Sequence, residues 1–339
     1  MRSTFFSSEP WPWFIKKPPV QRFFNFNLTC YTTTHMSWFP IVLLASLCWS
    51  ATNHIEKFLL SKYFVGGGAG GYQIFSTLEN ILFCALIFFF KPETLATPAR
   101  TALVLIASGA VYTFGMIAYL HALERDEASI VVPIWQTIPV FAFILGFFLL
   151  GETLSRWQLI GSVIIVAAAV SLSVDINVEK KRIKKSVLGL MLVASFLIAC
   201  SWLFFKIGAI GAIDFWVASF WQFIGSLIIG IGLFVCVPKF RAQFFQIFHA
   251  NTAQFFIIDL TSTLIDSAGN RLMAFALLSV PVALAQVVNG FQPVFVLLIA
   301  VFLTLFFPKL GVEKIDRAHI TQKIFAIFAM LCGAFIIGV

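Results

Sequence analysis

The sequence predicts an all-α polytopic membrane protein whose ten transmembrane helices form two inverted five-helix repeats. Three observations predict this fold class: an apolar composition, ten apolar segments of spanning length, and matched residues in the two halves of the chain. Of the 339 residues, 60% are hydrophobic and only 11% are charged, and the mean hydropathy is +0.95. A soluble domain of this size needs far more charged side chains to cover its surface.

Ten segments meet the requirement of a membrane-spanning helix, which is roughly 20 mostly apolar residues. Short connectors that contain Gly, Pro or charged residues separate these segments and leave no room for a soluble domain. The predicted helices are 38–60, 72–90, 101–122, 129–150, 157–174, 186–208, 215–237, 253–278, 282–307 and 322–339.

Residues 1–35 differ from the rest of the chain, because they combine basic residues and several prolines with aromatics that follow no helical period. Nothing in this stretch resembles the apolar core and cleavage site of a secretory signal. One interpretation is a disordered N-terminal extension. The other, which we favour, is that translation begins at Met36, directly before the first helix.

Two related halves, residues 36–178 and 186–339, are predicted from residues that recur in the same order. The recurring pairs include Lys57 and Lys206, Gln73 and Gln222, and Pro139 and Pro293. Because each half holds five helices, an odd number, the second half must enter the membrane in the opposite orientation. Inverted repeats of this kind build transporters whose substrate site lies near the membrane midplane, between the halves.

Pro139 and Pro293 are predicted to kink one helix in each half. Proline removes a backbone donor, and the carbonyl groups that lose their partner are tolerated in hydrocarbon only where protein groups or a watery cavity satisfy them. Polar and aromatic side chains precede both prolines, and we expect them to bind the substrate: Trp135, Gln136, Gln286, Asn289 and Gln292. The alternative is a pair of plain kinks whose neighbouring amides hold helices together.

A polar stripe runs along the predicted helix 253–278, where residues spaced by four, three and four positions share one face. Its members are Asp259, Thr263, Asp266 and Asn270. Together with Glu79 of the second helix, they are predicted to line a polar path, and a desolvated carboxyl group there is suited to carrying a proton. The alternative is a structural polar seam between helices. Arg271 lies off the stripe and is expected to pair or to snorkel.

The stretch FFLLGETLSRWQLIGSVIIVAAAVSLS, residues 147–173, resembles the signature between the fourth and fifth helices of EamA-like transporters in the drug/metabolite transporter superfamily. The preceding YLHALERDEASIVVPIWQTIPVF, residues 119–141, is also similar to that family. The resemblance spans residues 37–339, although the second half carries TLFFP at 304–308 where the Leu-Gly-Glu motif would recur. It implies transport, often export, of small organic molecules, commonly driven by a proton gradient. We expect Glu152 of the motif to cap backbone donors near the start of the fifth helix.

The sequence argues against several other classes of protein. An intramembrane aspartyl protease needs two acids that face each other from different helices, whereas Asp259 and Asp266 lie about 10 Å apart along one helix. No Walker motif, metal-binding pattern or cofactor motif is present, so neither an enzyme nor a cofactor or metal is expected. A membrane scaffold or sensor without turnover stays open as the alternative function.

The six cysteines show no Cys-x-x-Cys spacing, and the net charge of +8 comes from Lys and Arg gathered in connectors, so nucleic acid is not an expected partner. The expected partners are a small-molecule substrate and the lipid bilayer, and a homo-oligomer stays open. The expected location is a bacterial inner (plasma) membrane. Charge in the connectors favours both termini outside, whereas the resemblance implies both termini in the cytoplasm.

Overall fold

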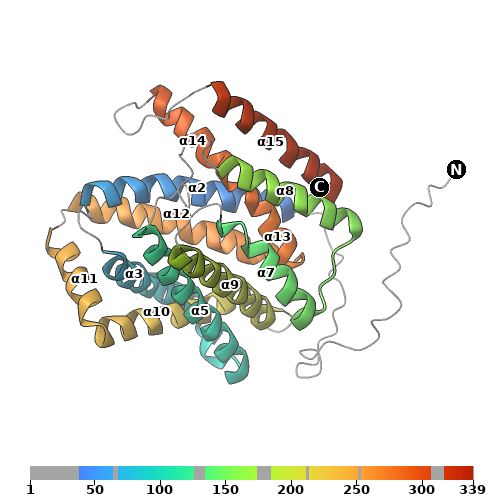
Figure 1. Cartoon of the computed structure of the whole chain (residues 1–339). Coiled ribbons are helices and arrows are strands. Elements are labelled where there is room, and N and C mark those ends of the chain that lie inside the picture. Colours follow the sequence, from blue (N-terminus) through green and yellow to red (C-terminus); the bar gives the residue numbers. More distant parts are fainter. Residues whose placement is uncertain are drawn as a thin grey trace.

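The computed structural model describes residues 38–63, 68–125, 134–173, 185–210, 214–250, 253–306 and 317–338. These residues are almost entirely helical and contain no strand, which confirms the predicted all-α class. The predicted extension 1–35 and the predicted start at Met36 lie outside the described residues. Figure 1 shows the helices packed into one bundle, with α2 and α12 side by side through its middle.

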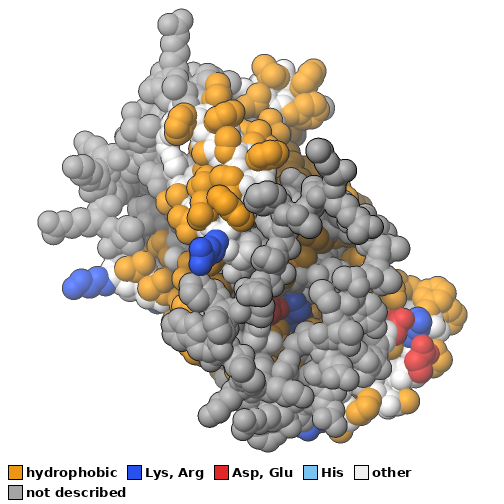
Figure 2. Space-filling view, turned by 90° about the vertical axis from the view of Figure 1, so that its right-hand side faces the viewer, with side chains coloured by type: hydrophobic (Ala, Val, Ile, Leu, Met, Phe, Trp, Pro, Cys, Tyr) orange, Lys and Arg blue, Asp and Glu red, His pale blue; other side chains and the backbone are white. Residues whose placement is uncertain are grey.

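Five helical segments of the described chain are long and apolar enough to cross a membrane: Gly70–Phe90, Ala99–Ala122, Lys185–Ala209, Phe215–Cys236 and Val282–Phe306. Three shorter helices, Ile138–Leu150, Arg156–Leu172 and Gln322–Ile337, are also apolar. Apolar side chains greatly outnumber charged ones on the described part of the face drawn in Figure 2, and Phe335 is 83% exposed. Such a surface is stable against acyl chains and unstable against water, so the protein is an integral membrane protein.

The first half follows the predicted helices closely, with one additional break. Glu79 forms a turn that divides the second predicted helix in two. Gly151 ends the π-helical segment η2 with a φ of 69°, a left-handed conformation that favours glycine. The elements are α2 (Trp38–Tyr63), α3 (Ala69–Leu78), α4 (Asn80–Phe90), η1 (Pro92–Ala96), α5 (Ala99–Leu123), α7 (Ile138–Leu145), η2 (Gly146–Leu150) and α8 (Arg156–Ser173).

The second half contains a helix that the sequence analysis did not predict. This helix, α11, packs against α3 so closely that a side chain at Gly70 would overlap the ring of Phe240, and one at Gly71 would overlap the backbone of Phe244. The elements are α9 (Lys185–Ala209), α10 (Phe215–Cys236), α11 (Pro238–Ala250), α12 (Ala253–Leu277), α13 (Val282–Val288), η3 (Asn289–Phe291), α14 (Gln292–Phe306) and α15 (Arg317–Ile337).

The chain breaks near both prolines that were predicted to kink helices. Pro139 lies in the first turn of α7, directly after a turn at Gln136 and Thr137. Pro293 lies in the first turn of α14, directly after the 3-10 segment η3. Proline is tolerated in the first turn because that backbone nitrogen has no helical acceptor. Each break therefore comes just before its proline, and the proline starts the next helix.

Helices from the two halves interleave in the bundle. The helix α5 packs along α9 and α10, α12 packs along α2, and α8 packs along α15 (Figure 1). Between α5 and α10 the backbones touch: a Cβ atom at Gly109 would lie 1.8 Å from the carbonyl oxygen of Gln222, and one at Gly225 would lie 2.0 Å from that of Ile106. Close approach through small residues is the usual way in which membrane helices associate.

Candidate functional site

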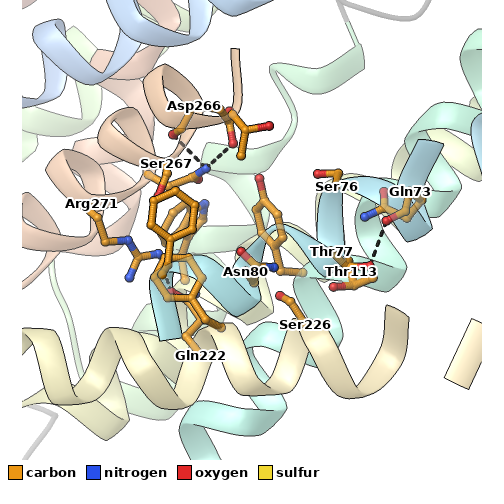
Figure 3. Close-up of a pocket in the computed structure, with 16 residues that line it drawn as sticks. Gln73, Ser76, Thr77, Asn80, Thr113, Gln222, Ser226, Asp266, Ser267 and Arg271 are labelled. Carbon is orange, nitrogen blue, oxygen red and sulfur yellow. Dashed lines mark hydrogen bonds between the residues drawn. The ribbon is translucent and has the colours of Figure 1, made fainter. Parts of the chain in front are cut away.

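A polar cavity of about 70 Å³ lies among α3, α4, α5, α9, α10 and α12. Figure 3 shows Asp266, Ser267 and Arg271 entering it from α12, with Gln73, Ser76 and Thr77 of α3 on the other side. Since a cavity needs about 10–15 Å³ of such space to admit one water, this cavity has room for more than one water. Its lining residues are Gln73, Ser76, Thr77, Asn80, Phe83, Tyr112, Thr113, Trp202, Gln222, Phe223, Ser226, Thr263, Asp266, Ser267, Asn270 and Arg271.

Arg271 is the cation of the cavity, and α10 holds it in place. Its guanidinium donates to the Ser219 hydroxyl and to the Gln222 side-chain oxygen, each at 2.7 Å. The guanidinium carbon lies 4.7 Å from the ring centroid of Phe223 and 5.6 Å from that of Phe205, within the range of cation–π attraction. Arg271 was expected to pair or to snorkel, and the structure instead anchors it in the cavity wall. Sequence reasoning missed this residue as a site candidate.

Asp266 supplies the negative charge of the cavity wall. Asn270, one turn further along α12, donates to the Asp266 carboxylate at 2.7 Å and to its backbone carbonyl at 3.1 Å. Asp266 and Arg271 line the same cavity, yet the ion pairs found among the described residues do not join them. The cavity therefore presents opposite charges at separate points of its wall.

Glu79 and Asp259 continue the polar region beyond the cavity. The Thr263 hydroxyl, which lines the cavity, donates to Glu79 at 2.5 Å. The Asp259 side chain, one turn before Thr263 on the same face of α12, is only 1% exposed, and neither of its carboxylate oxygens accepts a hydrogen bond from a described residue. The structure thus brings together all five residues predicted to line a polar path: Asp259, Thr263, Asp266, Asn270 and Glu79.

The five residues predicted to bind substrate lie elsewhere, around the junction of α7 with α13 and η3. None of Trp135, Gln136, Gln286, Asn289 and Gln292 lines the cavity. The Ser46 hydroxyl of α2 donates to the side-chain oxygen of Asn289 at 2.8 Å, and the Ser50 hydroxyl donates to the backbone carbonyl of Gln292 at 3.1 Å. The first contact favours, for Asn289, the alternative in which an amide holds helices together, and the substrate-binding role of the five residues stays a prediction.

The broken segments of the two halves do meet, as the sequence analysis expected. The helix α7 packs against α13, and a Cβ atom at Gly290 would lie 3.6 Å from the side-chain oxygen of Gln136. Gln136 and Asn289 are both buried, and the Trp135 ring packs 4.7 Å from that of Tyr119.

A buried ion pair joins the halves near this junction. The Lys206 ammonium, in a side chain that is 8% exposed, lies 2.6 Å from Glu152 Oε1 and also donates to the Val280 carbonyl at 2.6 Å. Glu152 Oε2 accepts from the backbone N–H of Val282, at the start of α13. Glu152 therefore caps backbone as expected, but it caps α13 of the other half, whereas α8 was predicted. No signal in the sequence pairs these two residues.

The fold and site define an integral membrane protein with a small cavity, lined by charged and polar side chains, among apolar helices. Residues 36–174 match the EamA-like transporter family, which confirms the predicted resemblance for this part of the chain.

Two further similarities concern part of the sequence and the fold. An uncharacterized protein of Methanocaldococcus jannaschii is 29% identical over 98 residues, which cover 29% of this chain and 72% of that protein. A crystal structure of a protein superposes with a TM-score of 0.65 at 13% identity, covering 90% of this chain and 97% of the other. At that identity the similarity shows the fold alone.

Proposed function

We propose that this protein is a secondary transporter that exports small organic solutes by alternating access, with protons as the coupling ion. The single observation that carries the proposal is the cavity, whose wall presents Asp266 and Arg271 separately among apolar helices. Ionised side chains at membrane depth are costly and usually mark a solute or ion pathway. A scaffold has no need of a wet cavity with two unpaired opposite charges.

Reciprocal packing supports the proposal of two inverted repeats. Contacts of α5 with α9 have a counterpart in contacts of α12 with α2, and contacts of α7 with α9 have a counterpart in those of α14 with α2. In the first half the first, third and fourth helices are α2, α5 and α7, and in the second half they are α9, α12 and α14. Exchanging the two sets turns each contact into its counterpart. Such reciprocity is what a two-fold relation between the halves produces.

One departure from this reciprocity supports alternating access. The helices α5 and α10 touch backbone to backbone through Gly109 and Gly225, whereas the corresponding helices α12 and α3–α4 both line the cavity and meet beside it through the hydrogen bond from Thr263 to Glu79. If the halves exchange these two arrangements, the contact opens on one side as it closes on the other. Rocking of one repeat against the other around a fixed site is the usual form of this motion.

The experiment is flux into vesicles with an imposed pH gradient, using purified protein and a panel of small metabolites and drugs. We expect at least one solute class to move and its flux to respond to the gradient. Arg271→Gln should abolish the flux, whereas Lys239→Gln, at an exposed position on α11, should not change it. Absence of flux for every solute would remove the transporter proposal, and saturable binding without flux would favour a sensor.

A further inference from the structure

We infer that Glu79 and Asp259, one from each half of the chain, form a carboxyl pair that binds a single proton at a site separate from the charged cavity. The proton binding itself follows from the contacts of the two side chains. Its role in driving transport rests on the proposed function.

The geometry places two acids against each other without a donor between them. Glu79 lies in the turn that separates α3 from α4 and bonds to Thr263 of α12, and Asp259 lies one turn before Thr263 on the same face of α12, which places the two carboxyl groups beside each other. Glu79 Oε2 already accepts the Thr263 hydroxyl. Both oxygens of Asp259 are buried and accept no hydrogen bond from the described residues.

A single shared proton resolves this arrangement. Two ionised carboxylates side by side in a dry region repel each other, and a buried carboxylate without hydrogen bonds loses its solvation. A proton on Glu79 Oε1 turns the repulsion into a charge-assisted O–H···O⁻ hydrogen bond to Asp259. Glu79 then donates to Asp259 through one oxygen and accepts the Thr263 hydroxyl through the other. Each of the three side chains then takes part in a hydrogen bond.

The surrounding ionisable groups do not supply another counter-charge. On α2, Glu56 accepts the Tyr72 hydroxyl of α3 at 3.3 Å, and on α12 Asp266 accepts Asn270. Arg271, the cation of the cavity, is bound by α10 and lies 12 residues from Asp259, or roughly 18 Å along a helix. Among the described side chains facing the pair, the neighbouring groups are acids and a phenol, which favour a proton over a second bare charge.

The position of the pair links the proton to the movement of the halves. Glu79 belongs to the first half and Asp259 to the second, so separation of α3–α4 from α12 breaks the O–H···O⁻ bond. Each carboxyl group then meets water, where its unperturbed protonation state is the ionised one at neutral pH, and the proton passes to water. Closure captures one proton again, so one proton is bound each time the pair closes; when separation opens the pair to one side and closure follows exposure to the other, one proton crosses per cycle.

The test is infrared difference spectroscopy of the purified full-length protein in lipid nanodiscs at neutral pH, in the C=O region of protonated carboxyl groups. We expect Glu79→Gln and Asp259→Asn each to remove a band of one carboxyl per chain, and the double variant to remove no more than either single one. The reason is that an amide at either position replaces the proton as the hydrogen-bond donor. Glu93→Gln, at an exposed side chain, should leave the spectrum unchanged.

Three results would overturn the inference. If the two acids are protonated independently, the double variant will lose two carboxyl bands where each single variant loses one. Two ionised acids would give no band to remove. A sodium site would give no band and a rise in melting temperature with sodium that Asp259→Asn abolishes. The exchanged variant, Glu79→Asp with Asp259→Glu, controls for folding and should keep the band. Because no substrate is needed, a protein with the shared proton but without flux would contradict the proposed function alone.

Discussion

The buried ion pair between Lys206 and Glu152 gives the most specific prediction about how the halves are held together. Replacement of Glu152 by Gln leaves an oxygen that accepts the Val282 N–H, so the cap on α13 survives. It leaves the Lys206 ammonium, which is almost fully buried, without its counter-ion. Removing one partner of a buried pair costs about 3–5 kcal/mol, because the remaining charge is uncompensated.

A second change should recover much of this loss. In the double variant Glu152→Gln and Lys206→Met, no charge is buried, and the remaining penalty is a Val280 carbonyl without its donor, which is about 1–3 kcal/mol. The double variant is therefore expected to be more stable than Glu152→Gln alone, although it carries two substitutions.

The assay is unfolding of the purified variants in detergent micelles, followed by tryptophan fluorescence, in a double-mutant cycle. As a control, the corresponding substitution Lys91→Met, in the exposed ion pair of Lys91 with Asp214, should have little effect on stability. If the losses of the two single variants add up in the double variant, the two side chains do not interact, and the reasoning about this junction is refuted.

Three further predictions concern packing, pH and the substrate. Gly225→Val should prevent the close approach of α10 to the Ile106 carbonyl and lower the melting temperature, whereas Gly232→Ala, which meets no atom within 4 Å, should not; equal melting temperatures would contradict the packing. Burial raises the pKa of Asp214, but the hydrogen bonds from Lys91 and from the Trp216 N–H together lower it by more. The pKa of Asp214 is therefore below its usual value. Because the pair is exposed, its stabilisation is small. It is present at neutral pH and disappears as the pH falls through the lowered pKa, and melting curves of Asp214→Asn between pH 7 and about 3 should lack this small loss. Gln292→Leu should leave the set of competing solutes unchanged, because Gln292 does not line the cavity and its bond from Ser50 is made by the backbone carbonyl; a changed competition profile would restore its predicted role in binding.

The positions of the helices were predictable because the apolar segments are long and the connectors carry the polar and turn-forming residues. Most predicted boundaries agree with the structure to within a few residues, as those of α5, α9 and α10 show. The exception is α11, whose sequence PKFRAQFFQIFHA mixes aromatics with basic and amide residues. Its helical state depends on packing against Gly70 and Gly71, which hydropathy does not report.

The site was predictable only in part, because a helical stripe shows which side chains share a face but not what they face. The spacing from Asp259 to Asn270 identified the polar side of α12. It could not show that α10 would bind Arg271 through Ser219 and Gln222, because that contact joins distant parts of the chain. The prolines likewise marked real breaks, but Asn289, near Pro293, contacts α2, and none of the polar groups predicted beside the prolines lines the cavity.

The central claim, a wet cavity that opens to each side of the membrane in turn, can be tested at Ser76. This residue lines the cavity and is close in size to cysteine. In a variant without native cysteines, Ser76→Cys should react with a charged, membrane-impermeant thiol reagent added to either side of sealed vesicles. Cysteine in place of Phe335, on the lipid-facing surface, should not react. Reaction from one side only, or from neither side, would contradict alternating access.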